Sequence, residues 1–172
     1  MKAKKLPRIS LNELDLNGGQ IHGLNLSHVD LSGSLIEYAT FTDCLFFGAI
    51  FDRVTATGSS FLSCEFTAAS FQDAQLTGCT FKSTDLQGCD LSGSILSHSR
   101  MERVNLSEAN LAGVTAVRTN FSEASLTEAK LVGANLTEAS FDGADPRAAD
   151  LRGALLDGAS FDNANLRLTR FD

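Results

Sequence analysis

Hydrophobic side chains recur at every fifth position along almost the whole chain. The series runs from Leu11 to Phe171 and holds 33 positions, of which sixteen are Leu, eleven Phe, two Ile and one Met. It departs from this pattern only at Ala56, Ala116 and Pro146, and the spacing never slips. Eleven of the twelve Phe residues lie on the series, so a period of five dominates the sequence.

The positions around each hydrophobic centre are selective as well. Two residues before the centre the chain is small in most repeats, and Cys44, Cys64, Cys79 and Cys89 all stand there. Asn, Asp, Ser and Thr dominate the position just before the centre, and thirteen of the fourteen glycines stand two residues after it. Each five-residue unit therefore combines one small and one large apolar position with polar ones.

A period of five fits neither an α-helix, with 3.6 residues per turn, nor a strand, with its alternation of two. It does not fit a coiled-coil heptad either. Because a unit of five residues cannot bury its own apolar pair, the units must stack on one another, and the pattern predicts a solenoid.

This spacing resembles the pentapeptide-repeat family, in which a small residue, Asn or Asp, Leu or Phe, a polar residue and a variable residue follow in order. Units such as Ala134-Asn135-Leu136-Thr137-Glu138 carry the resemblance, which covers nearly the whole chain. It implies an all-β fold, a right-handed quadrilateral parallel β-helix with four pentapeptides per coil, whose centre and small residues point inward. We therefore expect a basic N-terminal segment or cap at residues 1–10 and one uninterrupted β-helix of about eight coils over residues 11–172.

A coil of 20 residues also predicts that centres 20 apart stack in columns. The column that starts at Ile21 contains six Phe in eight positions, whereas the column from Leu16 to Leu156 contains none. We expect a Phe ladder on one wall, facing smaller residues. In Val54-Thr55-Ala56 and Val114-Thr115-Ala116 the large and small positions are exchanged, which roughly keeps the buried volume.

Pro146 is the third departure from the series. Because proline has no N–H, one hydrogen bond between coils must be missing there. We expect a local distortion at Asp145-Pro146-Arg147.

Composition excludes several classes of function. The formal net charge of -7 disfavours direct binding of nucleic acid, which needs clustered Lys and Arg. The longest apolar run, Cys44–Phe51, is far shorter than the roughly 20 residues of a membrane span. No apolar segment follows the basic N-terminus, so we expect no secretory signal, a cytoplasmic location and reduced thiols.

The residue types that carry chemistry are scattered. Cys44 and Cys64 would stack one coil apart, which a disulfide tolerates, but all four cysteines take the place of Ala, so we expect buried, inert thiols. His22, His28 and His98 are far apart and at outward positions, and no metal or nucleotide motif occurs. A filled interior leaves no cleft, so the sequence predicts no catalytic site, cofactor or metal, and a non-enzymatic protein.

Charge and exposed apolar residues indicate a surface for a protein partner. Residues 11–90 hold ten acids against Arg53 and Lys82 alone, a net charge of -8, whereas residues 91–172 have a net charge of -3. Leu45, Phe47 and Ile50 stand at outward positions around one corner, with Leu35, Tyr38 and Leu62 within about one coil. Such a cluster predicts either contact with a partner or cover by the N-terminal Leu6, Pro7 and Ile9. The candidate partner surface comprises Glu37, Asp43, Leu45, Phe47, Ile50, Asp52, Leu62, Glu65, Asp73, Asp85 and Asp90.

The repeat continues to the C-terminal residues without a capping element. An open solenoid end exposes apolar side chains and unpaired backbone groups. The sequence therefore suggests the hypothesis of a homodimer formed by end-to-end contact through the C-terminal coil. The candidate contact residues are Leu166, Leu168 and Phe171.

The resemblance also implies two functional hypotheses. Some members of the family resemble B-DNA in width and charge and bind type II topoisomerases. The chain is similar to them in its acidity and in units such as Asp43-Cys44-Leu45-Phe46, but it lacks their interrupting loops and their C-terminal dimerisation segment. The first hypothesis is a rigid acidic protein–protein interaction module. The alternative is a B-DNA mimic that binds DNA gyrase or topoisomerase IV and inhibits it or protects it from quinolones or toxins.

Overall fold

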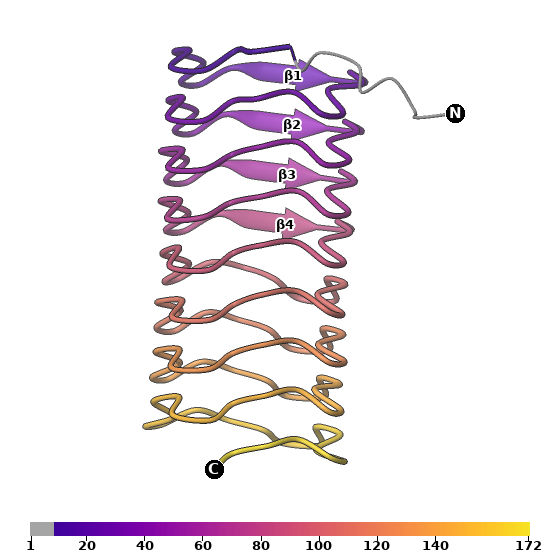
Figure 1. The fold of residues 1–172 in the computed structure, drawn as a ribbon, viewed down its shortest axis with the longest axis vertical. Helices are drawn as coiled ribbons and strands as arrows, with labels where there is room; N and C mark the ends of the chain where they lie inside the picture. The colour runs from indigo at the N-terminus through magenta and orange to yellow at the C-terminus, as the bar shows by residue number, and fades with distance from the viewer. Residues whose placement is uncertain (1–8) are drawn as a thin grey trace, which may run out of the picture.

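The computed structural model describes residues 9–172, which form one straight stack of coils (Figure 1). Partners in neighbouring coils are 20 residues apart, as in Ser10↔Asp30 and Asp30↔Ile50. We number the coils from residues 9–28 in steps of 20. Within each coil, successive groups of five residues form the first, second, third and fourth walls, so that coil 1 divides into 9–13, 14–18, 19–23 and 24–28. The fold is the expected right-handed quadrilateral parallel β-helix.

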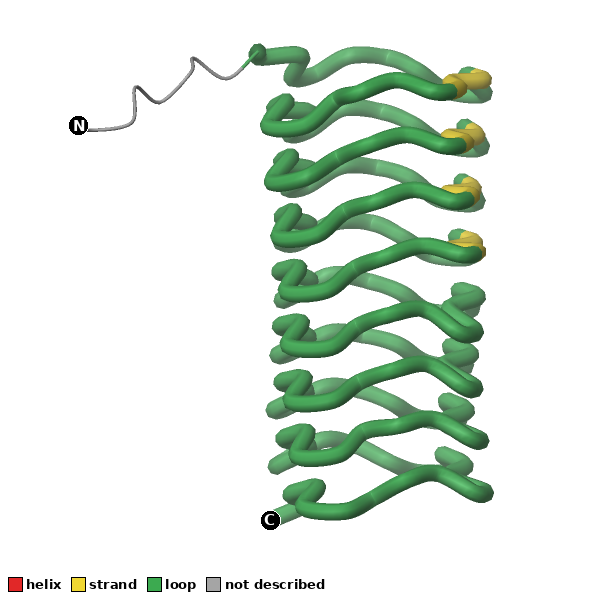
Figure 2. The backbone as a smooth tube through the Cα atoms, turned by 90° about the vertical axis from the view of Figure 1, so that its right-hand side faces the viewer, coloured by secondary structure: helices red, strands yellow, loops and turns green. Residues whose placement is uncertain are grey.

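Short parallel strands stack on the third wall of the first four coils. They are β1 (Gln20–His22), β2 (Thr40–Thr42), β3 (Ser60–Leu62) and β4 (Thr80–Lys82), and they pair in the order β1-β2-β3-β4. Figure 2 shows them on one side of the stack. Elsewhere the same pairing continues as isolated parallel bridges, because a turn follows after each short straight piece. The described residues contain no helix that could span a membrane.

The corners of the coils are tight turns. On most walls the C=O of the centre accepts the N–H three residues on, as in Ala39 N–H to Ile36 O at 3.1 Å. The residue two after the centre adopts a positive φ, for example 70° at Gly58 and 53° at Asp43. This left-handed conformation costs glycine little, which explains why glycine is concentrated at this position.

Where the residue before a centre is Asp or Asn, it often satisfies a further backbone donor. Its side chain accepts the N–H two residues on, as in Ser92 N–H to Asp90 Oδ1 at 3.0 Å and Ser107 N–H to Asn105 Oδ1 at 3.1 Å. Asn and Asp suit this local bond, which accounts for their frequency there.

The centres form a continuous core, buried in every case from Leu31 to Leu151. Phe61 stacks on Phe41 at 5.4 Å and on Phe81 at 5.0 Å, which confirms the ladder on the third wall. The expectation that this ladder faces smaller residues was wrong for coils 3 and 4. The Phe-free second wall is its neighbour, because consecutive pentapeptides form adjacent walls. The opposite first wall contributes a stacked pair of its own, Phe51 and Phe71.

The exchanged units pack as predicted. Val54, Ala56, Val114 and Ala116 are all fully buried, and both alanine centres lie on the second wall.

Pro146 removes one bond without disturbing its coil. Asp145 bridges Ser125 in the preceding coil but does not bridge Asn165 in the following one, as the missing N–H predicts. The predicted distortion is absent. The ring is buried like the other centres, and Ala149 N–H bonds to Pro146 O at 3.0 Å. Proline's restricted φ is compatible with the start of a turn, so only the hydrogen bond is lost.

Candidate interaction surface

Eight of the eleven predicted partner residues lie on two adjacent walls. The fourth wall carries Leu45, Phe47, Glu65 and Asp85, and the first wall carries Ile50, Asp52, Asp73 and Asp90, all within coils 2–5. Leu45, Glu65 and Asp85 are successive bridge partners in one column. We call these eight residues the acidic face.

Apolar side chains form the centre of the acidic face. Phe47 is 50% exposed and Leu45 38%, and Ile50 is half-buried across the corner. The Phe47 ring meets the ring of His28 edge to face, with 5.3 Å between centroids, so one of its edges is held in place. Leu6 and Pro7, predicted as a possible cover, lie outside the described residues, and Ile9 is 69% exposed.

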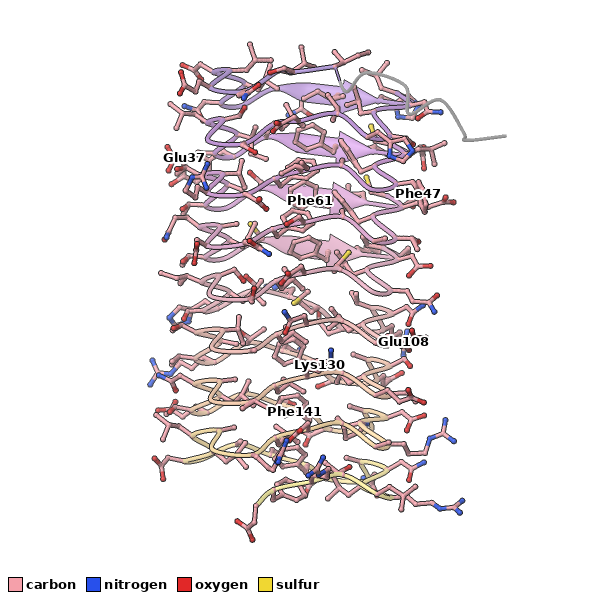
Figure 3. All side chains as sticks on the ribbon, in the orientation of Figure 1. Glu37, Phe47, Phe61, Glu108, Lys130 and Phe141 are labelled. Carbon is pink, nitrogen blue, oxygen red and sulfur yellow. The ribbon has the colours of Figure 1, made fainter. Side chains whose placement is uncertain are left out.

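The other three predicted residues lie elsewhere. Glu37 is on the second wall, and Figure 3 shows it projecting from the opposite side of the stack to Phe47. Asp43 and Leu62 are at the corner of the third and fourth walls, where Asp43 is 3.7 Å from His22 Nδ1. Leu35 and Tyr38 are exposed on the second wall, away from the Phe47 cluster.

The carboxylates of the acidic face fall into two groups. Asp52, Asp85 and Asp90 accept backbone and side-chain hydrogen bonds, for example Gln72 N–H to Asp52 at 3.1 Å and Asn105 Nδ2 to Asp85 at 3.1 Å. Burial opposes ionisation of Asp90, but hydrogen bonds from Ser92, Gln72 and Asn110 outweigh it and lower its pKa. Glu65 and Asp73 are exposed and have no side-chain partner in the described structure.

Ion pairs involving Arg increase the difference in unpaired negative charge between residues 11–90 and residues 91–172. The second half neutralises acids internally, as in Arg103–Glu123 at 2.7 Å and Arg118–Glu138 at 2.6 Å. Arg152 lowers the pKa of Asp150 to about 2 by hydrogen bonding. No Lys or Arg lies within 4.0 Å of a carboxylate of the acidic face in residues 9–172. This pairing was not predicted from the sequence, although Arg103 and Glu123 are 20 residues apart and therefore share a column.

Comparison with known families decides the classification. A profile described as "Pentapeptide repeat region" matches residues 36–111. A second, described as "Pentapeptide repeats (8 copies)", matches residues 119–145 and 147–172 and breaks at Pro146. The chain belongs to the pentapeptide-repeat family.

Solved pentapeptide-repeat structures share the fold. A trypsin-treated variant of QnrB1, described as a plasmid-mediated fluoroquinolone resistance protein, aligns with a TM-score of 0.82 at 20% identity, covering 96% of this chain and 92% of QnrB1. Full-length QnrB1 aligns with a TM-score of 0.69 at 19% identity, covering 91% of each chain. A search of curated protein sequences gives no match.

The thiols of this pentapeptide-repeat protein are free and buried, as predicted. Each donates to a carbonyl oxygen 23 residues earlier in the chain, for example Cys89 Sγ to Phe66 O at 2.9 Å and Cys79 Sγ to Ala56 O at 3.0 Å. Burial raises the pKa of Cys79 and of Cys89 to about 12. These thiols are therefore packing residues.

We expect the free energy of unfolding to fall as the pH rises above about 9. An unfolded thiol ionises near its ordinary pKa of 9.0, whereas Cys79 and Cys89 stay protonated until about 12. Their stabilising contribution is thus complete below pH 9 and is lost above it, by roughly 2–3 kcal/mol per thiol at pH 11. Guanidinium unfolding from pH 8 to pH 11 measures this. A Cys79→Ala/Cys89→Ala variant should show a clearly smaller decrease, and an identical decrease would contradict the assignment.

Within the described residues, the inter-coil bonds of the centres end at Leu151. Leu151 N–H bonds to Arg170 O at 2.7 Å, and no following centre has an inter-coil acceptor in the described chain. The predicted contact residues Leu166, Leu168 and Phe171 are 38%, 72% and 39% exposed. Together with Leu155, which is 55% exposed, they form an apolar C-terminal end.

Proposed function

We propose that this pentapeptide-repeat protein is a rigid acidic interaction module whose acidic face docks into a basic groove of a protein partner. The observation that carries the proposal is the combination of carboxylates without cationic partners and a central exposed apolar pair, Leu45 and Phe47. Charges of one sign steer and orient the partner, and buried apolar area then stabilises the complex.

The charge density supports a partner adapted to polyanions. The net charge of -8 over residues 11–90 spans four coils, which is roughly 19 Å at about 4.8 Å per coil. That is about one net negative charge per 2.4 Å, compared with about one per 1.7 Å of duplex DNA. A protein groove that binds duplex DNA would therefore attract this half of the rod.

The alternative function is a specific case of the same docking. In it, the protein mimics B-DNA, binds DNA gyrase or topoisomerase IV, and inhibits the enzyme or protects it from quinolones. The likeness to QnrB1 over nearly the whole chain supports this alternative at the level of the fold. Either function places the protein in the cytoplasm, which we propose as its location.

A gyrase supercoiling titration tests the alternative, with and without a fluoroquinolone, at low and high salt. If the DNA mimic is correct, micromolar protein inhibits supercoiling or rescues it from the drug, and the effect weakens steeply with salt. The absence of any effect would reject topoisomerase binding. Partner capture with the wild type and a Phe47→Ala variant would then test the general interaction module.

We further propose that two copies associate end to end through the apolar C-terminal end. A Leu168→Glu/Phe171→Glu variant should remain monomeric at concentrations where the wild type forms dimers, because the interface would contain unpaired charges. Sedimentation equilibrium at several concentrations measures this, with Leu45→Glu as a control six coils away from the C-terminal end. A wild type that stays monomeric throughout would refute the proposal.

A further inference from the structure

A hollow of about 480 Å³ opens on the third wall across coils 4 to 6. Its lining includes Thr80, Lys82 and Ser83 from coil 4, Arg100, Glu102 and Arg103 from coil 5, and Ser122 and Glu123 from coil 6. Its volume falls within the range of about 300–1,000 Å³ that is usual for small-molecule sites. All three residues of β4, the last of the short strands in Figure 2, line it.

A break in the hydrogen-bond ladder accompanies the hollow. The residue two after each centre donates its N–H to the following coil, as Ser63 does to Lys82 O at 2.8 Å and Arg103 to Ser122 O at 3.0 Å. Among the residues at this position from Glu13 to Ala148, Ser83 is the only one that does not make this bond. Its N–H therefore does not bond to the C=O of Glu102. A backbone donor without a partner therefore stands at the hollow.

The break follows from two different turns that meet there. In coil 4, Thr84 Oγ1 lies 3.0 Å from Phe61 O and 3.2 Å from Lys82 O, and the bond from Thr84 N–H to Phe81 O is not formed. In coil 5, Val104 N–H closes the turn on Met101 O at 3.4 Å. A turn without this N–H to C=O bond is therefore stacked on a turn that has it, at the corner where the bond from Ser83 N–H to Glu102 O is missing.

The cations at the hollow are unusual for this part of the rod. Lys82 is one of only two basic residues among residues 11–90, and Arg100 is the next along the chain. In the described structure, no carboxylate lies within 4.0 Å of the charged groups of Lys82 and Arg100. Glu102, which lines the same hollow, instead accepts Asn120 Nδ2 at 2.8 Å.

Arg103 is held in position by its neighbour in the column. Its Nε and Nη2 donate to Glu123 at 2.7 and 3.1 Å. Since a guanidinium has five N–H donors, three remain for a ligand. The hollow thus offers a fixed arginine, two unpaired cations, a backbone N–H and the hydroxyl groups of Thr80 and Ser83. Its two carboxylates, Glu102 and Glu123, are engaged by Asn120 and Arg103.

We propose that this hollow binds the phosphate group of a small molecule. The donors outnumber the acceptor positions of a single carboxylate and suit the three terminal oxygens of a phosphate, and the two unpaired cations match its double negative charge. The site is on the third wall and does not include any residue of the acidic face, so it is independent of the proposed docking.

Titrations of ¹⁵N-labelled protein with inorganic phosphate, ribose 5-phosphate and acetate at constant ionic strength test the proposal. We expect phosphate to shift the Ser83 amide resonance saturably, and to bind at least about tenfold more weakly to a Lys82→Gln/Arg100→Gln variant. The matched control is Arg53→Gln/Lys130→Gln, which removes the same charge from exposed residues of the first wall and should bind within about twofold of the wild type.

The arms of the experiment separate the possible ligands. Tighter binding of ribose 5-phosphate than of inorganic phosphate would assign the site to an organic phosphate, and equal binding to the free ion. The proposal is overturned if no saturable shift occurs, if both double variants lose affinity equally, or if acetate binds as tightly as phosphate. Unchanged circular dichroism spectra would show that the variants fold.

Discussion

Replacing Phe61 by Ala is expected to lower the free energy of unfolding by about 3–5 kcal/mol. Phe61 is fully buried and stacks between Phe41 and Phe81. It also meets Phe66 of the fourth wall edge to face at 5.3 Å. Its removal would leave a cavity in the core of coil 3. The backbone of coils 2–4 cannot collapse into this cavity without breaking inter-coil hydrogen bonds.

Guanidinium unfolding followed by circular dichroism measures the loss. Phe47→Ala and Phe171→Ala remove the same atoms from positions that are 50% and 39% exposed, and each should cost less than about 1.5 kcal/mol. Because a solenoid can unfold in sections, the loss should appear with an early transition of the coils around Phe61. Equal losses in Phe61→Ala and Phe47→Ala would refute the description of the core.

The second large effect is expected from neutralising the acidic face. A variant with Glu65→Gln, Asp73→Asn, Asp85→Asn and Asp90→Asn should bind a basic-groove partner at least about tenfold more weakly and with less salt dependence. The fold should be retained. Asn105 and Asn110 occupy the columns of Asp85 and Asp90 and make the same local backbone bond.

The matched control removes four exposed acids from the second half, by Glu108→Gln, Glu128→Gln, Asp157→Asn and Asp162→Asn. Both variants change the net charge equally, so only the position of the charge differs. In the gyrase titration, the control should retain the activity of the wild type and the first variant should lose it. If the two variants behave alike, the acidic face has no special role in binding.

Much of the candidate surface could be predicted because the repeat is strictly periodic. Once a coil contains 20 residues, position alone places Leu45, Glu65 and Asp85 in one column, and the structure confirms that column. The prediction grouped Glu37 and Tyr38 with Phe47 because they are close in sequence. In the β-helix, two pentapeptides along the chain lead to the opposite wall, so sequence neighbours can face in opposite directions.

The sequence by itself determined the period, the inward positions and the parallel β-helix, because each unit repeats the same local requirement for burial and backbone pairing. Only the tertiary structure showed that the ladder opens at Ser83. A turn points the centre and the small residue inward whether or not the N–H three residues on bonds to the C=O of the centre. The five-residue pattern therefore does not distinguish the two kinds of turn. Whether two coils bond at a corner depends on the shapes of both turns together, and that is decided only where they stack.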